Sequence, residues 1–138
     1  MVTIKSYTDI EQSRKLAEIL PAESADMCWT NHCYGSIRSS MTVSSKTIEE
    51  YKELLTRFGD LTSIDVFYPC WSLAALLNIL PKEINVQGTI YSINIHTKNK
   101  KWFIEYKCNN EEFVGVYSNV FVDACFEMIL KLKEKNLL

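Results

Sequence analysis

The sequence has little glycine and little proline, 4 and 3 residues respectively among 138. This scarcity excludes collagen-like and linker-like chains, which are rich in one or both. Neither charge is in strong excess, because 15 lysines and arginines face 17 aspartates and glutamates and leave a formal net charge of -2. The chain therefore has no long-range positive field to attract phosphate backbones, and nucleic-acid binding would require a local basic patch.

A long apolar run is also missing. The longest, at residues 70–80, contains a serine and an asparagine and falls short of the ~20 residues that a membrane-spanning helix needs. The N-terminal sequence MVTIKSYTDIEQSRK has no continuous apolar segment of the kind found in secretory signals. We therefore expect a cytoplasmic protein without a membrane segment.

Signatures of catalysis are absent as well. The sequence contains no glycine-rich phosphate loop, no H-E-x-x-H motif and no G-x-S-x-G nucleophile elbow. One enzymatic alternative stays open at Cys70, which precedes a predicted helix whose dipole would lower the pKa of the thiol. A histidine or a carboxylate in a cleft would then have to act as the base. Because no pattern announces such a pair, we favour a non-enzymatic function and assign no catalytic residue.

The five cysteines form an odd set at irregular spacing, which does not indicate a disulfide framework. We expect reduced thiols that pack inside the fold. The cluster most similar to a metal site is Cys28, His32 and Cys33, but structural zinc needs four ligands, usually in paired modules. We therefore predict no metal and no other cofactor.

The chain has the apolar side chains for a core, since 47% of its residues are hydrophobic and its length is that of one ordinary domain. We predict a single α+β domain over residues 1–138. Its antiparallel sheet has three or more strands and packs against the C-terminal and central helices.

The strands are predicted from a period of two in the second half of the chain. Three segments joined by polar turns show it, namely 89–96, 101–108 and 112–117. In the middle segment Trp102, Ile104 and Tyr106 share one face, and we expect this face to look into the core. That leaves Phe103 as the only ring beside Lys101 and Lys107, so we do not expect a nucleic-acid partner.

Helices are predicted where apolar residues recur at helical spacing after a capping residue. Their N-caps are Thr8, Thr47, Ser72 and Asn119. The helix from Ser72 is short and apolar on nearly all sides, which is typical of a central position.

Residues 22–45 have the least regular pattern and read as a loop or an edge strand. Trp29 and Tyr34 have no evident structural role there. We predict that Trp29, His32 and Tyr34 form a surface that binds an unidentified protein or small ligand.

Two motifs carry a resemblance. Residues 69–81 contain P-C-W-S-L-A-A-L-L followed by L-P, and residues 123–129 read D-A-C-F-E-M-I. With the S-A-D-M at residues 24–27, these resemble a group of small uncharacterised proteins from phages and mobile elements of Bacteroides-type gut bacteria. The group's pattern is P-A-W-S-L-x-A-L-L-x-x-L-P, so Cys70 stands where alanine is expected. The resemblance implies a cellular context and no activity.

Overall fold

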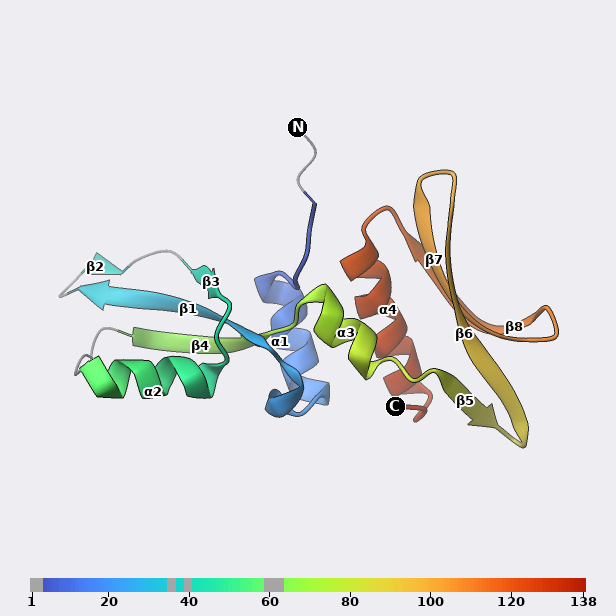
Figure 1. The fold of residues 1–138 in the computed structure, drawn as a ribbon, viewed down its shortest axis with the longest axis horizontal. Coiled ribbons are helices and arrows are strands. Elements are labelled where there is room, and N and C mark those ends of the chain that lie inside the picture. Colours follow the sequence, from blue (N-terminus) through green and yellow to red (C-terminus); the bar gives the residue numbers. More distant parts are fainter. Residues whose placement is uncertain (1–3, 35–36, 39–40, 59–63) are drawn as a thin grey trace. The chain divides into compact units, whose positions relative to one another are not determined.

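The computed structural model describes the backbone of residues 4–34, 37–38, 41–58 and 64–138. Side chains at residues 32–34, 37–38, 55–58 and 64–66 lie outside the description. The chain forms two compact units, a first unit of residues 7–75 and a second unit of residues 1–6 with 76–138 (Figure 1). Each unit combines helices with an antiparallel sheet, so the predicted α+β class is confirmed. The single-domain assignment stays a prediction.

The first unit is built around β1 (Met27–Tyr34), which pairs antiparallel with three other strands. The remaining elements are α1 (Ile10–Ile19), the short 3-10 helix η1 (Ala22–Ser24), β2 (Ile37–Arg38), β3 (Thr42–Ser44), α2 (Ile48–Phe58) and β4 (Ile64–Cys70). Three strands therefore come from the segment that the sequence pattern left irregular. β4 also continues through Pro69, which pairs with Cys28.

The start of α1 differs from the prediction. Asp9, not Thr8, is the N-cap, and it exchanges hydrogen bonds with Gln12 in a capping box. The Thr8 hydroxyl is buried instead, where it lies 2.7 Å from the Ser13 hydroxyl and accepts from the Trp71 backbone N–H at 3.1 Å. A buried hydroxyl needs such partners, and this requirement takes Thr8 away from the helix end.

Two stretches distant in sequence meet in the first unit. Asp26 accepts the backbone N–H of Ser72 at 2.9 Å and also the Ser72 hydroxyl. Ser24 accepts the Trp71 indole N–H at 2.9 Å. The Ser72 hydroxyl in turn accepts the Ala75 N–H at 3.1 Å, which confirms Ser72 as the cap of the central helix.

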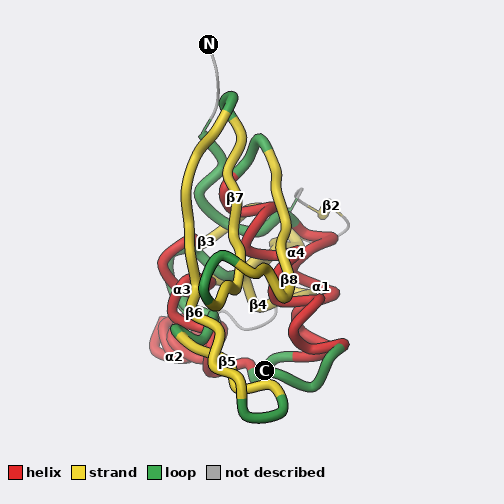
Figure 2. Tube along the Cα trace, turned by 90° about the vertical axis from the view of Figure 1, so that its right-hand side faces the viewer, coloured by secondary structure: helices red, strands yellow, loops and turns green. Residues whose placement is uncertain are grey.

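The second unit is a four-stranded meander in the order β5-β6-β7-β8 with one covering helix. Its elements are the end of α3 (Leu73–Ile79), then β5 (Glu83–Val86), β6 (Thr89–Lys98), β7 (Lys101–Cys108), β8 (Glu111–Ser118) and α4 (Phe121–Glu134). The three predicted strands are confirmed, and β5 is an addition to them. Figure 2 shows the strands in front and α4 behind them.

Each hairpin of this meander closes in a two-residue turn. The central pairs are Gln87-Gly88, Asn99-Lys100 and Asn109-Asn110, and all six residues have positive φ. Positive φ at both positions is the geometry of the type I′ turn, whose twist matches that of the strands. Gly88 and Asn110 are residue types suited to the second position, whereas Lys100 holds φ at 62°.

The core of the second unit lies between the sheet and α4. From the sheet it takes Ile104, Tyr106, Val114 and Val116, and from α4 Cys125, Met128, Ile129 and Leu132. The Tyr106 hydroxyl donates to the Pro81 carbonyl at 2.7 Å, which satisfies the one polar atom of this buried ring. Trp102 stacks on Phe121 with centroids 4.2 Å apart. The predicted inward face of β7 is thus confirmed.

The N-terminus of α4 corrects one more expectation. Val120, not Asn119, is the N-cap, and it has no side-chain hydrogen bond. The Ser118 hydroxyl accepts the Val120 N–H at 3.1 Å and so covers this helix end from the preceding strand.

Replacing Asp26 by alanine removes both acceptors from Ser72. We expect Asp26→Ala to lower the free energy of unfolding by about 1–2 kcal/mol, because a side-chain acceptor at a helix start is worth roughly that much. Asp26→Asn keeps one acceptor oxygen and should cost less. Urea unfolding of both variants measures the difference, and equal losses would contradict this role of Asp26.

The positive φ of Lys100 predicts that glycine at this position makes the protein more stable. We expect Lys100→Gly to raise the free energy of unfolding by about 0.5–1 kcal/mol, because a non-glycine residue at positive φ costs roughly 1–2 kcal/mol and glycine's freedom in the unfolded chain offsets part of this. Asn110→Gly, at the same turn position, should gain less because asparagine tolerates this conformation. Thermal unfolding tests the pair, and a destabilised Lys100→Gly protein would refute the strain.

Candidate functional site

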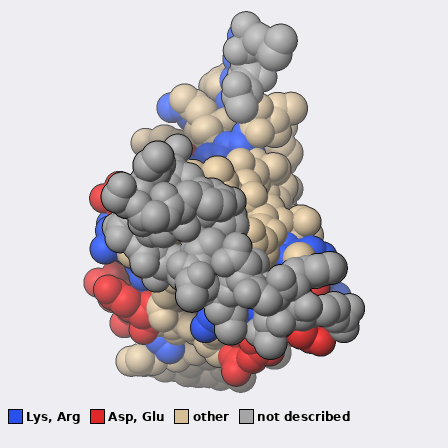
Figure 3. All heavy atoms as spheres, turned by 90° about the vertical axis from the view of Figure 1, so that its left-hand side faces the viewer, with Lys and Arg blue, Asp and Glu red and all other residues tan. Residues whose placement is uncertain are grey.

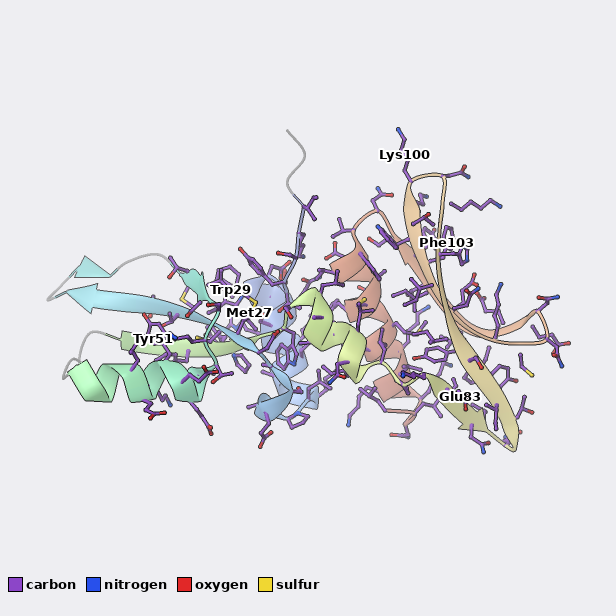
Figure 4. All side chains as sticks on the ribbon, viewed as in Figure 1. Met27, Trp29, Tyr51, Glu83, Lys100 and Phe103 are labelled. Carbon is purple, nitrogen blue, oxygen red and sulfur yellow. The ribbon has the colours of Figure 1, made fainter. Side chains whose placement is uncertain are left out.

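The predicted site residues Trp29, His32 and Tyr34 all lie on β1. The Trp29 indole N–H donates to the Thr8 carbonyl at 3.0 Å, and the Trp29 ring meets the Tyr7 ring edge to face at 5.8 Å (Figure 4). Trp29 therefore holds the segment before α1 against the sheet. The side chains of His32 and Tyr34 lie outside the description, so ligand binding by the three residues stays a prediction.

A buried polar group lies beside these residues. Oδ1 of Asn31 is buried and has no hydrogen-bond partner in the described part of the chain. Asn31 sits where the pairing of β1 with β4 shifts register, between Thr30 and His32. An unsatisfied buried acceptor costs about 1–3 kcal/mol. No described contact of the first unit accounts for this cost at Asn31.

A pocket of about 250 Å³ opens in the first unit between η1, the start of α2 and β4. Its lining is largely apolar and includes the residues Glu23 and Glu49. The Glu50 N–H at this end of α2 already donates to the Thr47 hydroxyl at 3.1 Å. Figure 3 shows acidic side chains along the lower part of the face drawn, with lysine and arginine side chains between them. The described lining residues include no lysine or arginine for an anionic ligand, and we assign no ligand to the pocket.

Cys70, the possible nucleophile, is completely buried. Its thiol donates to the Thr8 carbonyl at 3.5 Å and accepts from the Thr8 hydroxyl at 3.7 Å. Burial raises the pKa of Cys70, and hydrogen bonds from Thr8 and Ser13 offset only part of that rise. A pKa lowered by the helix dipole was therefore a wrong prediction. The described hydrogen-bond partners of this thiol are hydroxyl and carbonyl groups, none of which is a general base.

A row of three rings crosses the second sheet on the face opposite α4. His96, Phe103 and Tyr117 occupy directly paired positions on β6, β7 and β8, and we call them the aromatic row. The His96 and Phe103 rings are parallel within 4° at 5.1 Å, and the Phe103 and Tyr117 rings are 5.6 Å apart. Tyr117 is 63% exposed and His96 is also in part accessible. No described element of the second unit covers this face (Figure 2).

Charged groups border the row on one side. Glu105, which follows Phe103 on the same face of β7, contacts Lys107 Nζ at 2.9 Å and His96 Nε2 at 3.3 Å. Burial alone would raise the pKa of Glu105, but its hydrogen bonds and charge contacts with Lys107 and His96 lower it. The ionised carboxylate therefore fixes the His96 ring beside Phe103. Its contribution to folding is present above the unfolded-state pKa and is lost as the pH falls through the folded-state value.

Gly115 of β8 lies opposite Glu105 on the face of the aromatic row. Because Gly115 has no side chain, the Glu112 carboxylate has space there. A Cβ at Gly115 would collide with that carboxylate. Glu112 thus lies over the outer face of β8, on the same side of the row as Glu105.

The other side of the row carries lysines. Lys98 and Lys101 form the last pair of the β6–β7 hairpin, and Lys100 projects from its tip (Figure 4). Lys101 Nζ lies 5.0 Å from the centroid of the Tyr117 ring, a cation–π contact. Carboxylates therefore border the aromatic row on one side and ammonium groups border it on the other.

Sequence reasoning missed most of this surface. The prediction that Phe103 is the only ring beside Lys101 and Lys107 was wrong, because Lys101 contacts Tyr117 and cross-strand pairing also adds His96 to this face. Both residues belong to predicted strands, so the alternation of each strand indicates which of its residues share a face. Only the pairing register between strands shows that the two residues lie in one line with Phe103. The turn asparagines were the signal that could have fixed this register.

Comparison with known proteins gives no relative for this chain: no family model, curated protein or solved structure matches it. Among the described helices, none has both the length and the apolar character that crossing a membrane requires.

The buried thiols predict low reactivity. Burial raises the pKa of Cys28 to about 11 and that of Cys125 to about 12, and the pKa of Cys70 is raised as well. At neutral pH we expect these three to react with iodoacetamide at least about a hundredfold more slowly in the folded than in the urea-unfolded protein. Peptide mass spectrometry reads each site, and rapid alkylation of native Cys70 would reopen the enzymatic alternative.

Proposed function

We propose that this chain is a small binding protein that holds its ligand on the aromatic row. The observation that supports the proposal is the alignment of three rings on one sheet face. Tyr117 is 63% accessible, and His96 and Phe103 are partly accessible. Rings gathered on a surface lose the free energy that burial would provide, and such patches mark interaction sites.

Binding accounts for the row better than catalysis does. Glu105 is shared between His96 and Lys107, so its charge is already balanced and its contacts hold a ring in place. The alternative enzyme, with Cys70 as nucleophile, would need an accessible thiolate, and this thiol is buried with a raised pKa. A cytoplasmic location and an origin in a phage or mobile element stay part of the proposal and rest on the sequence alone.

A titration with free aromatic compounds tests the surface without assuming the natural ligand. Indole, phenol, adenosine and thymidine are added in turn to the isotope-labelled protein, and amide chemical shifts are followed by NMR. We expect at least one compound to shift the amides of His96, Phe103 and Tyr117 in a saturable manner, because flat rings extend a row of rings. Shifts confined to other residues, or none with any compound, would refute the surface.

Two variants make this test specific. Tyr117→Ala removes the most exposed ring and should weaken the response about fivefold or more. Ile90→Ala is the matched control, because Ile90 is an exposed apolar side chain on the same face of β6, remote from the row. An equal loss in the two variants would show general surface adsorption and count against the proposal.

A further inference from the structure

Three lysines of the β6–β7 hairpin stand where local stability favours other residues. Lys98 and Lys101 are directly opposite each other, and like charges at such a pair repel. Lys100 has φ of 62° at the turn position where the neighbouring hairpins have Gly88 and Asn110. Residues that break local rules in this way are expected at functional sites, where the ligand compensates the cost.

The three ammonium groups are also not neutralised by an ion pair within the described part of the chain. Among the described residues, no carboxylate forms an ion pair with Lys98, Lys100 or Lys101, whereas Lys107 on the other side of the row is paired with Glu105. The hairpin tip is therefore a local basic patch on a chain whose net charge is -2. A local patch of this kind is what binding of a polyanion to such a chain requires.

The patch and the row are close enough for a single ligand unit to contact both. Along β6 and β7, the pair of Lys98 and Lys101 is one two-residue step, roughly 6.8 Å, from the pair of His96 and Phe103. The row is also open at its ends. β5 pairs with β6 only as far as Ser92, and β8, which carries Tyr117, is an edge strand.

We infer that the ligand is single-stranded nucleic acid, whose bases stack on the aromatic row while its phosphates contact the hairpin lysines. This inference rests on the proposed function and names its ligand class. Lysines on one side of the rings fit an anionic backbone, and the uncharged bases fit the rings themselves. Asn94 and Glu105, next along the strands, offer hydrogen-bond groups to base edges. An acidic peptide would supply charge for the lysines but no flat uncharged rings to stack on the row.

The test is fluorescence anisotropy with labelled oligodeoxythymidine and oligouridine of about ten nucleotides, within the range that single-strand folds cover. We expect saturable binding in low salt and a slope of log affinity against log salt near about -2, since three lysines contribute roughly -0.7 each. Tyr117→Ala should weaken binding about fivefold or more, and Tyr117→Phe, which keeps the ring, should retain most of it.

Lys100→Gly is the decisive variant, because the fold favours glycine at this turn position and the protein stays folded. It should weaken binding roughly fivefold to tenfold at about 50 mM salt and reduce the salt slope by about 0.7. Two controls should bind as the unchanged protein does. Asn110→Gly makes the same backbone change without a charge, and Lys133→Gln makes the same charge change on α4.

Failure of this inference differs from failure of the proposed function. If free aromatic compounds shift the row but neither oligonucleotide binds below about 100 μM in low salt, the ligand class is wrong and the binding surface stands. Binding that survives both Tyr117→Ala and Lys100→Gly, or that Lys133→Gln weakens equally, would also overturn the inference. So would a concentration-dependent dimer abolished by Tyr117→Ala, because a second copy would then occupy the row.

Discussion

The register of the β6–β7–β8 meander determines both the core and the exposed face of the second unit. Its hairpins are closed by two-residue turns with positive φ at both central positions, and this turn type leaves one pairing of the strands. In that pairing Ile104 and Tyr106 face α4 while Phe103 faces away. A slip of one residue would exchange the two sets, exposing the core and burying the aromatic row. The turn asparagines are therefore as important to the surface as the rings are.

The bulge in β8 shows why this surface is hard to read from the sequence. Strict alternation places Phe113 on the same face as Tyr117. The register shifts after Tyr106, however, and Phe113 packs on Tyr91 with ring centroids 5.1 Å apart. Lys135, the C-cap of α4, lies near the Phe113 ring. One extra residue thus sends Phe113 to the covered face and leaves Tyr117 on the open one. Periodicity predicted β7 correctly because that strand has no irregularity before Lys107, whereas the row required pairing information.

The fold could be predicted where a single segment determines its own structure. The apolar stripe of α4 and the Thr47 cap of α2 are local patterns, and both helices are present. Structure set by distant partners could not be predicted. Thr8 leaves the helix cap because Trp71 and Ser13 need its hydroxyl, and β1 forms from a polar segment because β4 pairs with it. In such places tertiary hydrogen bonds outweigh local preference.

The motifs of this sequence serve the fold, whereas its candidate site does not. The S-A-D-M and P-C-W-S-L stretches meet through Asp26 with Ser72 and Ser24 with Trp71, so their residues are accounted for by capping α3 and satisfying a buried indole. Cys70 is buried, where a small side chain suffices. The most recognisable residues therefore build the fold. The hairpin lysines reduce local stability, and the aromatic row lies outside the core. Function is to be sought where the fold gives no other reason for a residue.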